Sequence, residues 1–471
     1  MNNDTIAAIA TPIGRGGIGI IKISGDRALI IAESIFRKSV SKPRQLQTLN
    51  SDAFHPLSSH RLHHGTIVDP EKDRILDEVL VSVMLAPNTY TKENIVEINT
   101  HSGHVVLASI LNLVLKQGAR LAEPGEFTKR AYLNGRIDLT QAEAVIDVIN
   151  SRTDKALEVA TSQVKGHLKE IIESIRDSML AILTEIEAAI DFPDDVGEII
   201  RTDAIMNVLE EQIIGGLKTL LDQYESGHIL KEGLKIAIVG RPNVGKSSLL
   251  NRLIQDDRVI VTPIPGTTRD LIEETLNIRG IPVIVADTAG LHKTDDPVEV
   301  IGIAKTKEYI DGSDLVLFMV DASTPLTNED HTICETIGKK PCILVVNKSD
   351  LVDKDFEIAA PEQWQGYPSI KISALYGNGL GALKDLIAKV SIGEHRLEVQ
   401  STIVPNLRHK MALDQSLLLV QSAVKAIQDA MPSELIAIDI QDAIDSLGEI
   451  IGMTAKEDVL DQIFSRFCIG K

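Results

Sequence analysis

The segment from Gly240 to Ser247 has the residue types and spacing of a phosphate-binding loop. It reads Gly-Arg-Pro-Asn-Val-Gly-Lys-Ser, overlaps the end of the apolar run KIAIVG and matches the pattern GxxxxGK[ST]. In this pattern backbone N–H groups surround the phosphates, the lysine reaches the β- and γ-phosphates, and the final hydroxyl binds Mg²⁺. The N-terminus of the following helix faces the same anion. We therefore expect a nucleoside triphosphate site centred on Lys246 and Ser247.

Three later segments indicate that the nucleotide is GTP. Asp287-Thr288-Ala289-Gly290 follows a strand-like run, so that Asp287 can hold Mg²⁺ through water and Gly290 can donate its N–H to the γ-phosphate. Asn347-Lys348-Ser349-Asp350 offers a carboxylate that can accept from N1–H and the exocyclic amine of guanine, a donor pair that adenine lacks. Ser373-Ala374-Leu375 resembles the loop that contacts the guanine carbonyl oxygen in GTPases. Each segment alone could be an ordinary turn, but together with the phosphate loop they predict a domain that binds and hydrolyses GTP.

The catalytic side of this domain departs from Ras-like enzymes. Those enzymes carry a glutamine that orients water directly after the DTAG segment. Here Leu291 stands at that position, and a leucine cannot orient a nucleophile. The replacement candidates lie between Asp295 and Glu299. No arginine finger is evident in the sequence, so the positive charge that stabilises the transition state must come from another source.

The pattern of apolar residues places these segments in an α/β domain. Between about Leu234 and Ala388, strand-like runs alternate with helical runs, which is the pattern of a parallel sheet. Helical spacing dominates on both sides, from Leu139 to about Tyr224 and again after Pro405. The simplest interpretation is one helical domain interrupted by an inserted α/β domain, since insertion succeeds where the two chain ends lie close together.

The N-terminal part of the chain has a different pattern. Short β-rich runs occupy Thr5 to about Asn99, and a helical run ends at Gly118, which predicts a small α+β domain. The expected boundaries are residues 1–120 for the N-terminal domain, 121–230 with 390–471 for the helical domain, and 231–389 for the inserted domain.

Composition limits the class of protein. In 471 residues, 48 Lys and Arg against 67 Asp and Glu give a net charge of −19, which argues against a broad basic surface for nucleic acid. The three cysteines, Cys334, Cys342 and Cys468, cannot form a disulfide framework and fit a reducing compartment. No apolar run approaches the roughly 20 residues that span a bilayer, and the first residues lack a leader pattern. We therefore expect a cytoplasmic protein that does not contact a membrane.

Motifs spread along the whole chain resemble those of a known family, the tRNA-modification GTPases called MnmE or TrmE. The motifs are ATPIGRGGIGIIKISG, PGEFTKRAYLNGRIDLTQAEAVIDVI, GRPNVGKSSLLN, IVTPIPGTTRD, DTAGLHKTDDPVEVIG and FCIGK. The first, second and last are absent from generic GTPases. The resemblance implies an N-terminal folate-binding-like α+β domain, a discontinuous all-α helical domain and an inserted Ras-like P-loop GTPase domain with a parallel-sheet α/β fold.

For the inserted domain, the resemblance implies two catalytic residues and two metal ions. Lys246 and Glu299 are the implied catalytic residues, with Glu299 as general base through a bridging water. By residue type alone, Glu299 would more often be a solvated helix residue. The implied ligands are Ser247 and Thr268 for Mg²⁺, and Asn243, Thr262, Ile264 and Thr267 for K⁺. The expected GTP-binding residues are Asn243, Val244, Gly245, Lys246, Ser247, Ser248, Thr262, Pro263, Ile264, Pro265, Gly266, Thr267, Thr268, Asp287, Thr288, Ala289, Gly290, Asn347, Lys348, Asp350, Ser373, Ala374 and Leu375.

For the N-terminal domain, the resemblance implies a site for a tetrahydrofolate derivative. The matching positions are Lys22, Glu97, Arg136 and Lys471. Lys22 stands where arginine is usual, and Arg136 stands where lysine is common. Both keep a positive charge for a folate carboxylate, although arginine and lysine differ in geometry. The family also places its C-terminal tail near this pocket.

Two smaller groups of residues have alternative interpretations. Cys468 could be a reactive thiol beside Lys471, an inert tail residue, or part of a lipidation box, for which CIGK is a poor match. A catalytic Cys468 is therefore one candidate among three. His60, His63 and His64 could suggest a metal site, but without partner ligands at suitable spacing we expect them in a solvated loop.

The resemblance implies a homodimeric, K⁺-stimulated GTPase that forms a heterotetramer with MnmG, a partner that carries FAD. The pair would add a carboxymethylaminomethyl-type group to carbon 5 of the wobble uridine of certain tRNAs, using a folate one-carbon unit.

A rival class is a ribosome-assembly GTPase, an RNA-binding switch that shares the GRPNVGKS and GTTRD elements. That rival predicts a KH-like module, and the sequence has no GXXG loop in a basic setting. A polymerising GTP-dependent scaffold would leave the N-terminal motifs and the CIGK tail without a purpose.

Overall fold

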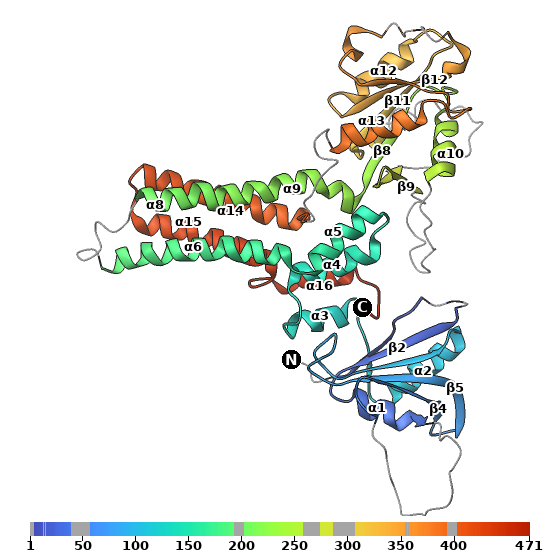
Figure 1. Cartoon of the computed structure of the whole chain (residues 1–471), viewed down its shortest axis with the longest axis vertical. Helices are drawn as coiled ribbons and strands as arrows, with labels where there is room; N and C mark the ends of the chain where they lie inside the picture. Colours follow the sequence, from blue (N-terminus) through green and yellow to red (C-terminus); the bar gives the residue numbers. More distant parts are fainter. Residues whose placement is uncertain are drawn as a thin grey trace, which may run out of the picture. The chain divides into compact units, whose positions relative to one another are not determined.

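Two compact units make up the described part of the chain in this computed structural model (Figure 1). Among the described residues, the first unit contains those up to Ile146 together with Ile451–Lys471, and the second contains Asp147 to Ile450. The structure describes residues 4–12, 14, 16–38, 57–192, 202–257, 274–285, 307–353, 356, 358, 360–392 and 403–471. Each unit contains one sheet.

The first unit is built on a seven-stranded sheet in the order β3-β4-β5-β6-β2-β1-β7. Neighbouring strands are antiparallel except for the parallel pair β1 and β7. The strands are β1 (Ile6–Ile9), β2 (Ile18–Ser24), β3 (Phe36–Lys38), β4 (Arg61–Asp69), β5 (Arg74–Met84), β6 (Ile95–His101) and β7 (Arg120–Leu121). Helices α1 (Ala28–Ile35) and α2 (His104–Lys116) share a hydrophobic core with this sheet.

Alternation along β2 decides which side chains face that core. Ile21 and Ile23 are fully buried in the core shared with α1 and α2, whereas Lys22 between them points to the opposite face. Lys22 pairs in register with Glu97 of β6, so both side chains lie on the face away from α1 and α2. An antiparallel sheet with one packed face leaves its other face available for polar groups.

The rest of the first unit joins segments that are far apart in the sequence. Helices α3 (Glu126–Leu133), the start of α4 (Leu139–Asn150) and α16 (Glu457–Ser465) pack around Phe464 and Phe467. The Tyr132 hydroxyl donates to the Gly452 carbonyl at 2.6 Å. The C-terminal residues then return to the sheet side, where Ile469 forms a β-bridge with Pro124.

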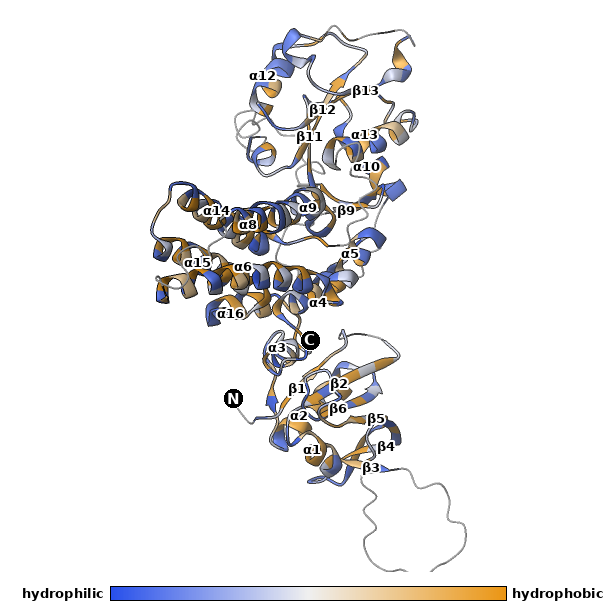
Figure 2. Cartoon of the chain, turned by 60° about the vertical axis from the view of Figure 1, so that its left-hand side comes forward, coloured by the Kyte–Doolittle hydropathy of each residue, from blue (hydrophilic) through white to orange (hydrophobic). Residues whose placement is uncertain are grey.

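In the second unit, the residues that precede and follow an α/β segment in the sequence form helices. They are α5 (Asp154–Val164), α6 (His167–Asp191), α8 (Thr202–Asn207), the π-helix η1 (Val208–Ile214), α9 (Gly215–Glu232), α14 (Leu407–Gln428) and α15 (Ser433–Ile451). Hydrophobic and hydrophilic residues alternate around the longer helices (Figure 2). In α6 the buried positions, among them Leu168, Ile172, Ile175 and Met179, recur every three or four residues and form one face of the helix.

A set of polar interactions joins the two points where the chain enters and leaves the α/β segment. Lys231, near the end of α9, pairs with Asp147 at 2.7 Å and donates to Gln163 Oε1 at 2.8 Å. The Gln163 amide donates to the carbonyl of Val404, which precedes α14. Lys231 and Val404 are 173 residues apart in sequence, yet Lys231 Nζ lies 3.4 Å from the Val404 carbonyl oxygen.

The α/β segment forms a six-stranded sheet in the order β13-β12-β11-β8-β10-β9. The strands are β8 (Leu234–Val239), β9 (Glu274–Ile278), β10 (Ile281–Val285), β11 (Leu315–Asp321), β12 (Cys342–Asn347) and β13 (Ser369–Lys371). β11 and β12 are buried throughout, as expected for central parallel strands. Helices α10 (Lys246–Asp257) and α13 (Leu380–Ile392) pack in one core cluster, and α12 (Asn328–Ile337) packs in the other.

The prediction of a parallel sheet is confirmed for five strands, whereas β9 runs antiparallel to β10. The physical reason is the two-residue connection Arg279-Gly280, in which both residues have positive φ, 54° and 85°. Such a turn joins antiparallel strands because its twist matches theirs.

The expectation of a solvated loop for the three histidines is wrong for two of them. His63 and His64 lie on β4, and His63 is buried with Nε2 3.0 Å from the Ser58 carbonyl oxygen. Within the described ranges no group of three or more His, Cys, Asp or Glu side chains could hold a metal ion. None of the helices in those ranges is long and apolar enough to cross a membrane.

Candidate functional site

The P-loop (Gly240–Ser247) connects β8 to α10, as the sequence predicts. Its two pattern glycines have φ values of 152° and 103°, which side chains rarely adopt. A Cβ at Gly240 would collide with the Met319 carbonyl, and one at Gly245 would collide with the Asn347 amide. The loop therefore lies directly against the ends of β11 and β12, and glycine is required at both positions.

Lys246 is held inside the curve of this loop. Its Nζ donates to the carbonyls of Gly240 and Arg241 at 2.7 and 2.9 Å. Burial lowers the pKa of Lys246, and the negative charge of Glu329 acts in the opposite direction. Ser247 and Ser248 are exposed on the first turn of α10, where N–H groups and the helix dipole favour an anion.

The Asn347 side chain joins the P-loop to the predicted base-recognition loop. It is buried, its Nδ2 donates to the Val244 carbonyl at 2.7 Å, and its Oδ1 accepts from the Ala374 N–H at 3.0 Å. Ser373 beside it is fully buried, whereas Leu375 is exposed. Three of the four predicted nucleotide segments are therefore connected by one amide.

Lys348 and Asp350 follow Asn347 with different surroundings. Lys348 has a φ of 63°, and its Nζ pairs with Asp321 Oδ2 at 2.6 Å. Burial alone would raise the pKa of Asp321, but hydrogen bonds from Lys348 and Ser323 hold it below its ordinary value. The Asp350 side chain is exposed in a short 3₁₀ turn, where its carboxylate is open to a ligand. Sequence reasoning missed Asp321, although it ends the buried run LVLFMVD.

The remaining residues predicted for this site lie outside the described part of the chain. They are Thr262, Pro263, Ile264, Pro265, Gly266, Thr267, Thr268, Asp287, Thr288, Ala289, Gly290 and Glu299. Their roles therefore stay predictions. Asn243, the described member of the predicted K⁺ ligands, is exposed with a φ of 64°.

In the first unit, two of the charged residues predicted for the N-terminal site lie over the ring of one tyrosine, and a third forms an ion pair with one of them. Lys22 and Glu97 form an ion pair at 3.7 Å. Lys22 Nζ lies 5.7 Å from the ring centroid of Tyr90, and the Arg136 guanidinium lies 4.7 Å from the same centroid. Burial lowers the pKa of Lys22, Glu97 opposes that shift and Lys471 adds to it. We call Lys22, Tyr90, Glu97, Phe127, Arg136 and Lys471 the N-terminal cluster.

The C-terminal tail joins this cluster through α3. The Lys471 carbonyl accepts from the Phe127 N–H at 3.2 Å, and the Cys468 carbonyl accepts from the Lys471 N–H at 3.3 Å. The Cys468 thiol is exposed. The structure therefore brings Lys471 to the other predicted residues, while a catalytic role of Cys468 stays a prediction.

Tyr90 and Phe127 are members of the cluster that sequence reasoning missed. The Phe127 ring centroid lies 5.4 Å from Lys22 Nζ, and the Tyr90 hydroxyl is hydrogen-bonded to Thr128 at 3.0 Å. Aromatic residues make up only 3% of the chain, and that scarcity is the signal that could have drawn attention to them.

An ion network fixes the segment that carries Tyr90. Arg130 is largely buried and binds Asp4 at 2.7 Å, Glu93 at 3.2 Å and Glu126 at 3.0 Å. Because Glu93 lies three residues after Tyr90, this network ties the Tyr90 loop to α3. The amide of Asn134 adds a hydrogen bond to the Thr91 carbonyl at 2.7 Å.

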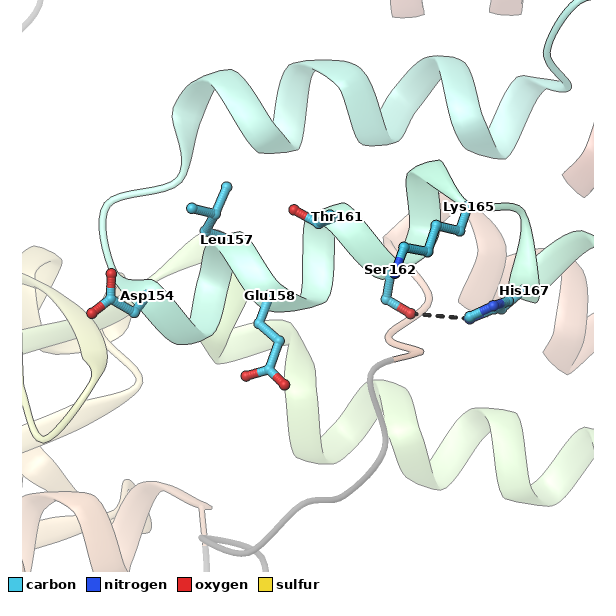
Figure 3. Close-up of a pocket in the computed structure, with 7 residues that line it drawn as sticks. All are labelled: Asp154, Leu157, Glu158, Thr161, Ser162, Lys165 and His167. Atoms are coloured by element: carbon cyan, nitrogen blue, oxygen red, sulfur yellow. Dashed lines mark hydrogen bonds between the residues drawn. The ribbon is translucent and has the colours of Figure 1, made fainter.

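The described residues also form an open pocket of about 440 Å³ along one face of α5 (Figure 3). Ser162 and His167 are hydrogen-bonded there at 3.2 Å. Its lining residues are Asp154, Leu157, Glu158, Thr161, Ser162, Lys165 and His167. Opposite charges are mixed along this surface and none of the predicted site residues belongs to it, so the candidate functional sites are the P-loop region and the N-terminal cluster.

The sheet is parallel except for β9, its P-loop requires glycine at two positions, and an asparagine at the end of β12 is hydrogen-bonded to the P-loop and to the loop after β13. Together these features define the class of P-loop GTPases. Models of two domains match this chain, the GTP-binding protein TrmE N-terminus over residues 5–136 and the MnmE helical domain over residues 139–468. The chain belongs to the MnmE (TrmE) family.

Curated relatives match the chain over nearly its full length. The tRNA modification GTPase MnmE of Alkaliphilus oremlandii is 45% identical and covers 100% of this chain and 99% of its own. That of Thermoanaerobacter pseudethanolicus is 48% identical over 99% of both chains. Among solved structures, the G domain of the T. maritima FeoB iron transporter is 27% identical, covering 33% of this chain and 98% of its own, with a TM-score of 0.25.

Asp350→Asn should change the base preference of the site. The amide cannot accept hydrogen bonds from both guanine donors, so we expect GTP affinity to fall about 10- to 100-fold. Affinity for xanthosine triphosphate, whose carbonyl can accept from the new amide, should rise. Fluorescence titration with both nucleotides measures the change, and Asp353→Asn, at an exposed carboxylate nearby, is the control. Equal losses for both nucleotides would contradict base recognition by Asp350.

Proposed function

We propose that this chain hydrolyses GTP as part of a tRNA-modification reaction. The observation that carries the proposal is the buried Asn347 amide, which joins the P-loop to the Ala374 loop in a chain of the MnmE family. Relatives at 45% and 48% identity over almost the whole chain are tRNA modification GTPases.

The described residues support a specific arrangement of GTP and Mg²⁺. Lys246 would bind the β- and γ-phosphates from inside the P-loop, and the exposed Ser247 hydroxyl would bind Mg²⁺ together with Thr268. Mg²⁺ would offset negative charge on the phosphates. Asp350 would bind the guanine edge, with Ser373, Ala374 and Leu375 beside its carbonyl oxygen. Glu299 would activate water in place of the missing glutamine.

A K⁺ ion is the proposed source of positive charge at the transition state. Asn243 is exposed and has a side-chain oxygen of the kind that hard cations prefer, which fits a cation ligand. Thr262, Ile264 and Thr267 would complete the set at the interface of two facing inserted domains in a homodimer. K⁺ would stabilise negative charge that an arginine finger stabilises in other GTPases.

GTP hydrolysis should therefore depend on the monovalent cation. At equal ionic strength we expect turnover to be at least about tenfold faster in KCl than in NaCl, because the ion replaces an arginine finger. Asn243→Ala should remove the difference, and Asn251→Ala, at an exposed asparagine on α10, should preserve it. Equal rates in the two salts with the unmodified chain would exclude the K⁺ site.

The N-terminal cluster is proposed to bind a tetrahydrofolate derivative. Lys22, Arg136 and Lys471 supply positive charge for carboxylates, and Tyr90 and Phe127 supply aromatic surface. Glu97, paired with Lys22, can accept hydrogen bonds from a heterocycle. The cluster therefore has the donor set that an anionic, aromatic one-carbon carrier requires.

Equilibrium titration with tetrahydrofolate tests this assignment. We expect saturable binding, and we expect Arg136→Ala to raise Kd about tenfold because a charged partner is lost. Lys116→Ala, at an exposed lysine at the end of α2, is the matched control and should bind like the unmodified chain. Absence of saturable binding by the unmodified chain would remove the folate assignment.

The modification itself is proposed to require MnmG, which supplies FAD in a heterotetramer. The pair would place a carboxymethylaminomethyl-type group on carbon 5 of the wobble uridine, with the one-carbon unit from folate, in the cytoplasm. The alternative is a ribosome-assembly GTPase that acts only as an RNA-binding switch. The N-terminal cluster favours the modification enzyme, because a switch of that kind has no need for it.

Nucleoside analysis of tRNA from cells that lack this chain decides between the two. We expect the modified wobble uridine to disappear and to return when the chain is supplied. Glu299→Ala should bind GTP but fail to restore the modification, whereas Glu434→Ala, at an exposed glutamate on α15, should restore it. An unchanged wobble uridine in the deficient cells would favour the ribosome-assembly alternative.

A further inference from the structure

The arginine of the P-loop is directed away from the loop and toward the start of α12. Arg241 Nε lies 3.6 Å from Asp330 Oδ2, and a terminal nitrogen of Arg241 donates to the Thr324 hydroxyl. The Arg241 side chain is 17% exposed and the Asp330 side chain is 0% exposed. This buried pair therefore links the first half of the P-loop to the segment that begins α12.

Asp330 also caps the N-terminus of α12, and this role can be separated from its ion pair with Arg241. Its Oδ2 accepts from the Thr327 N–H at 2.9 Å and from the Thr327 hydroxyl at 3.0 Å, as part of a capping box. A neutral side chain can make the same capping bonds, so capping alone does not require a charge. Among the described residues, no hydrogen-bond donor reaches the buried Asp330 Oδ1, and no cation other than Arg241 forms an ion pair with Asp330. A buried carboxylate needs such compensation.

The link to Arg241 acts on the part of the loop that holds the catalytic lysine. The Arg241 carbonyl accepts from Lys246 Nζ at 2.9 Å. At the other end of the loop, the Val244 carbonyl accepts from Asn347 at 2.7 Å. Hydrogen bonds to the Arg241 and Val244 carbonyls therefore hold the loop on both sides of Asn243, which has a φ of 64°.

We propose that Asp330 is a positioning residue for the nucleotide site, acting through Arg241. The ion pair fixes the backbone at Arg241, and this backbone fixes the carbonyl that holds Lys246. Removing the carboxylate charge leaves the Arg241 guanidinium without a charged partner and releases the first half of the P-loop. The proposal rests on the GTP-binding function proposed above, and it adds a residue that has no contact with the nucleotide.

Binding of a fluorescent GDP derivative to the full chain tests the proposal. Asp330→Asn keeps an oxygen for the Thr327 cap but removes the charge, and Arg241→Gln removes the other half of the pair. Each should raise Kd about tenfold, which corresponds to about 1.4 kcal/mol. The double variant should bind no more weakly than the weaker single variant, because both changes remove the same interaction. Thr327→Ala is the matched control: it removes the capping hydroxyl, keeps the ion pair, and should lower Tm while leaving Kd within about twofold.

Each outcome bears on a different part of the claim. Additive losses in the double variant, or an equal loss in Thr327→Ala, would overturn the positioning role in favour of general destabilisation. If Asp330→Asn does not fold, Arg241→Lys decides, since it keeps the charge and should recover most of the affinity lost in Arg241→Gln. Recovery supports the ion pair, and equal losses in the two Arg241 variants overturn it. Failure of the unmodified chain to bind the derivative would overturn the proposed function and the positioning role with it, whereas normal binding by the unmodified chain with unchanged Kd in Asp330→Asn and Arg241→Gln would overturn the positioning role alone.

Discussion

The Asn347 amide is the contact that joins two separate loops of the nucleotide region. A primary amide carries a donor and an acceptor in one rigid plane. Here the donor fixes the Val244 carbonyl of the P-loop, and the acceptor fixes the Ala374 N–H of the loop after β13. An aspartate would lack the donor, and a side chain at Gly245 would occupy the space of the amide nitrogen. The P-loop and the predicted base-recognition loop are therefore held by the same side chain.

The N-terminal cluster is organised by a different balance of forces. Glu97 and two aromatic rings interact favourably with the Lys22 ammonium group. Burial and the positive charge of Lys471 act against it and lower the pKa of Lys22. Such a site gains from an anionic ligand, because added negative charge compensates several cations held close together. The ion pairs of Arg130 tie the segment that carries Tyr90 to α3 without involving the residues of the cluster.

Apolar runs and motif spacing in the sequence predicted much of the fold and some of the site. The KIAIVG and CILVVN runs form β8 and β12, and the P-loop lies between a strand and a helix as its spacing requires. The two P-loop glycines could be predicted from local geometry and Asn347 from its motif, but the motif did not predict that the Asn347 amide joins Val244 to Ala374. Asp321, Asp330 and Tyr90 could not be predicted, since each is defined by a partner distant in sequence or by the packing around it. The antiparallel β9 was missed because Arg279-Gly280 is a weak turn signal in which arginine adopts a positive φ.

The hydrogen bonds among Lys231, Gln163 and Val404 have a consequence for folding. They close a loop in which Lys231 and Val404 are 173 residues apart. In a flexible chain the entropy of closing a loop of that size opposes folding by about 4–5 kcal/mol. A compact α/β segment that folds first brings its two ends together and lowers this barrier for the surrounding helices. Folding of the inserted segment before the surrounding helices would therefore remove much of this entropic cost.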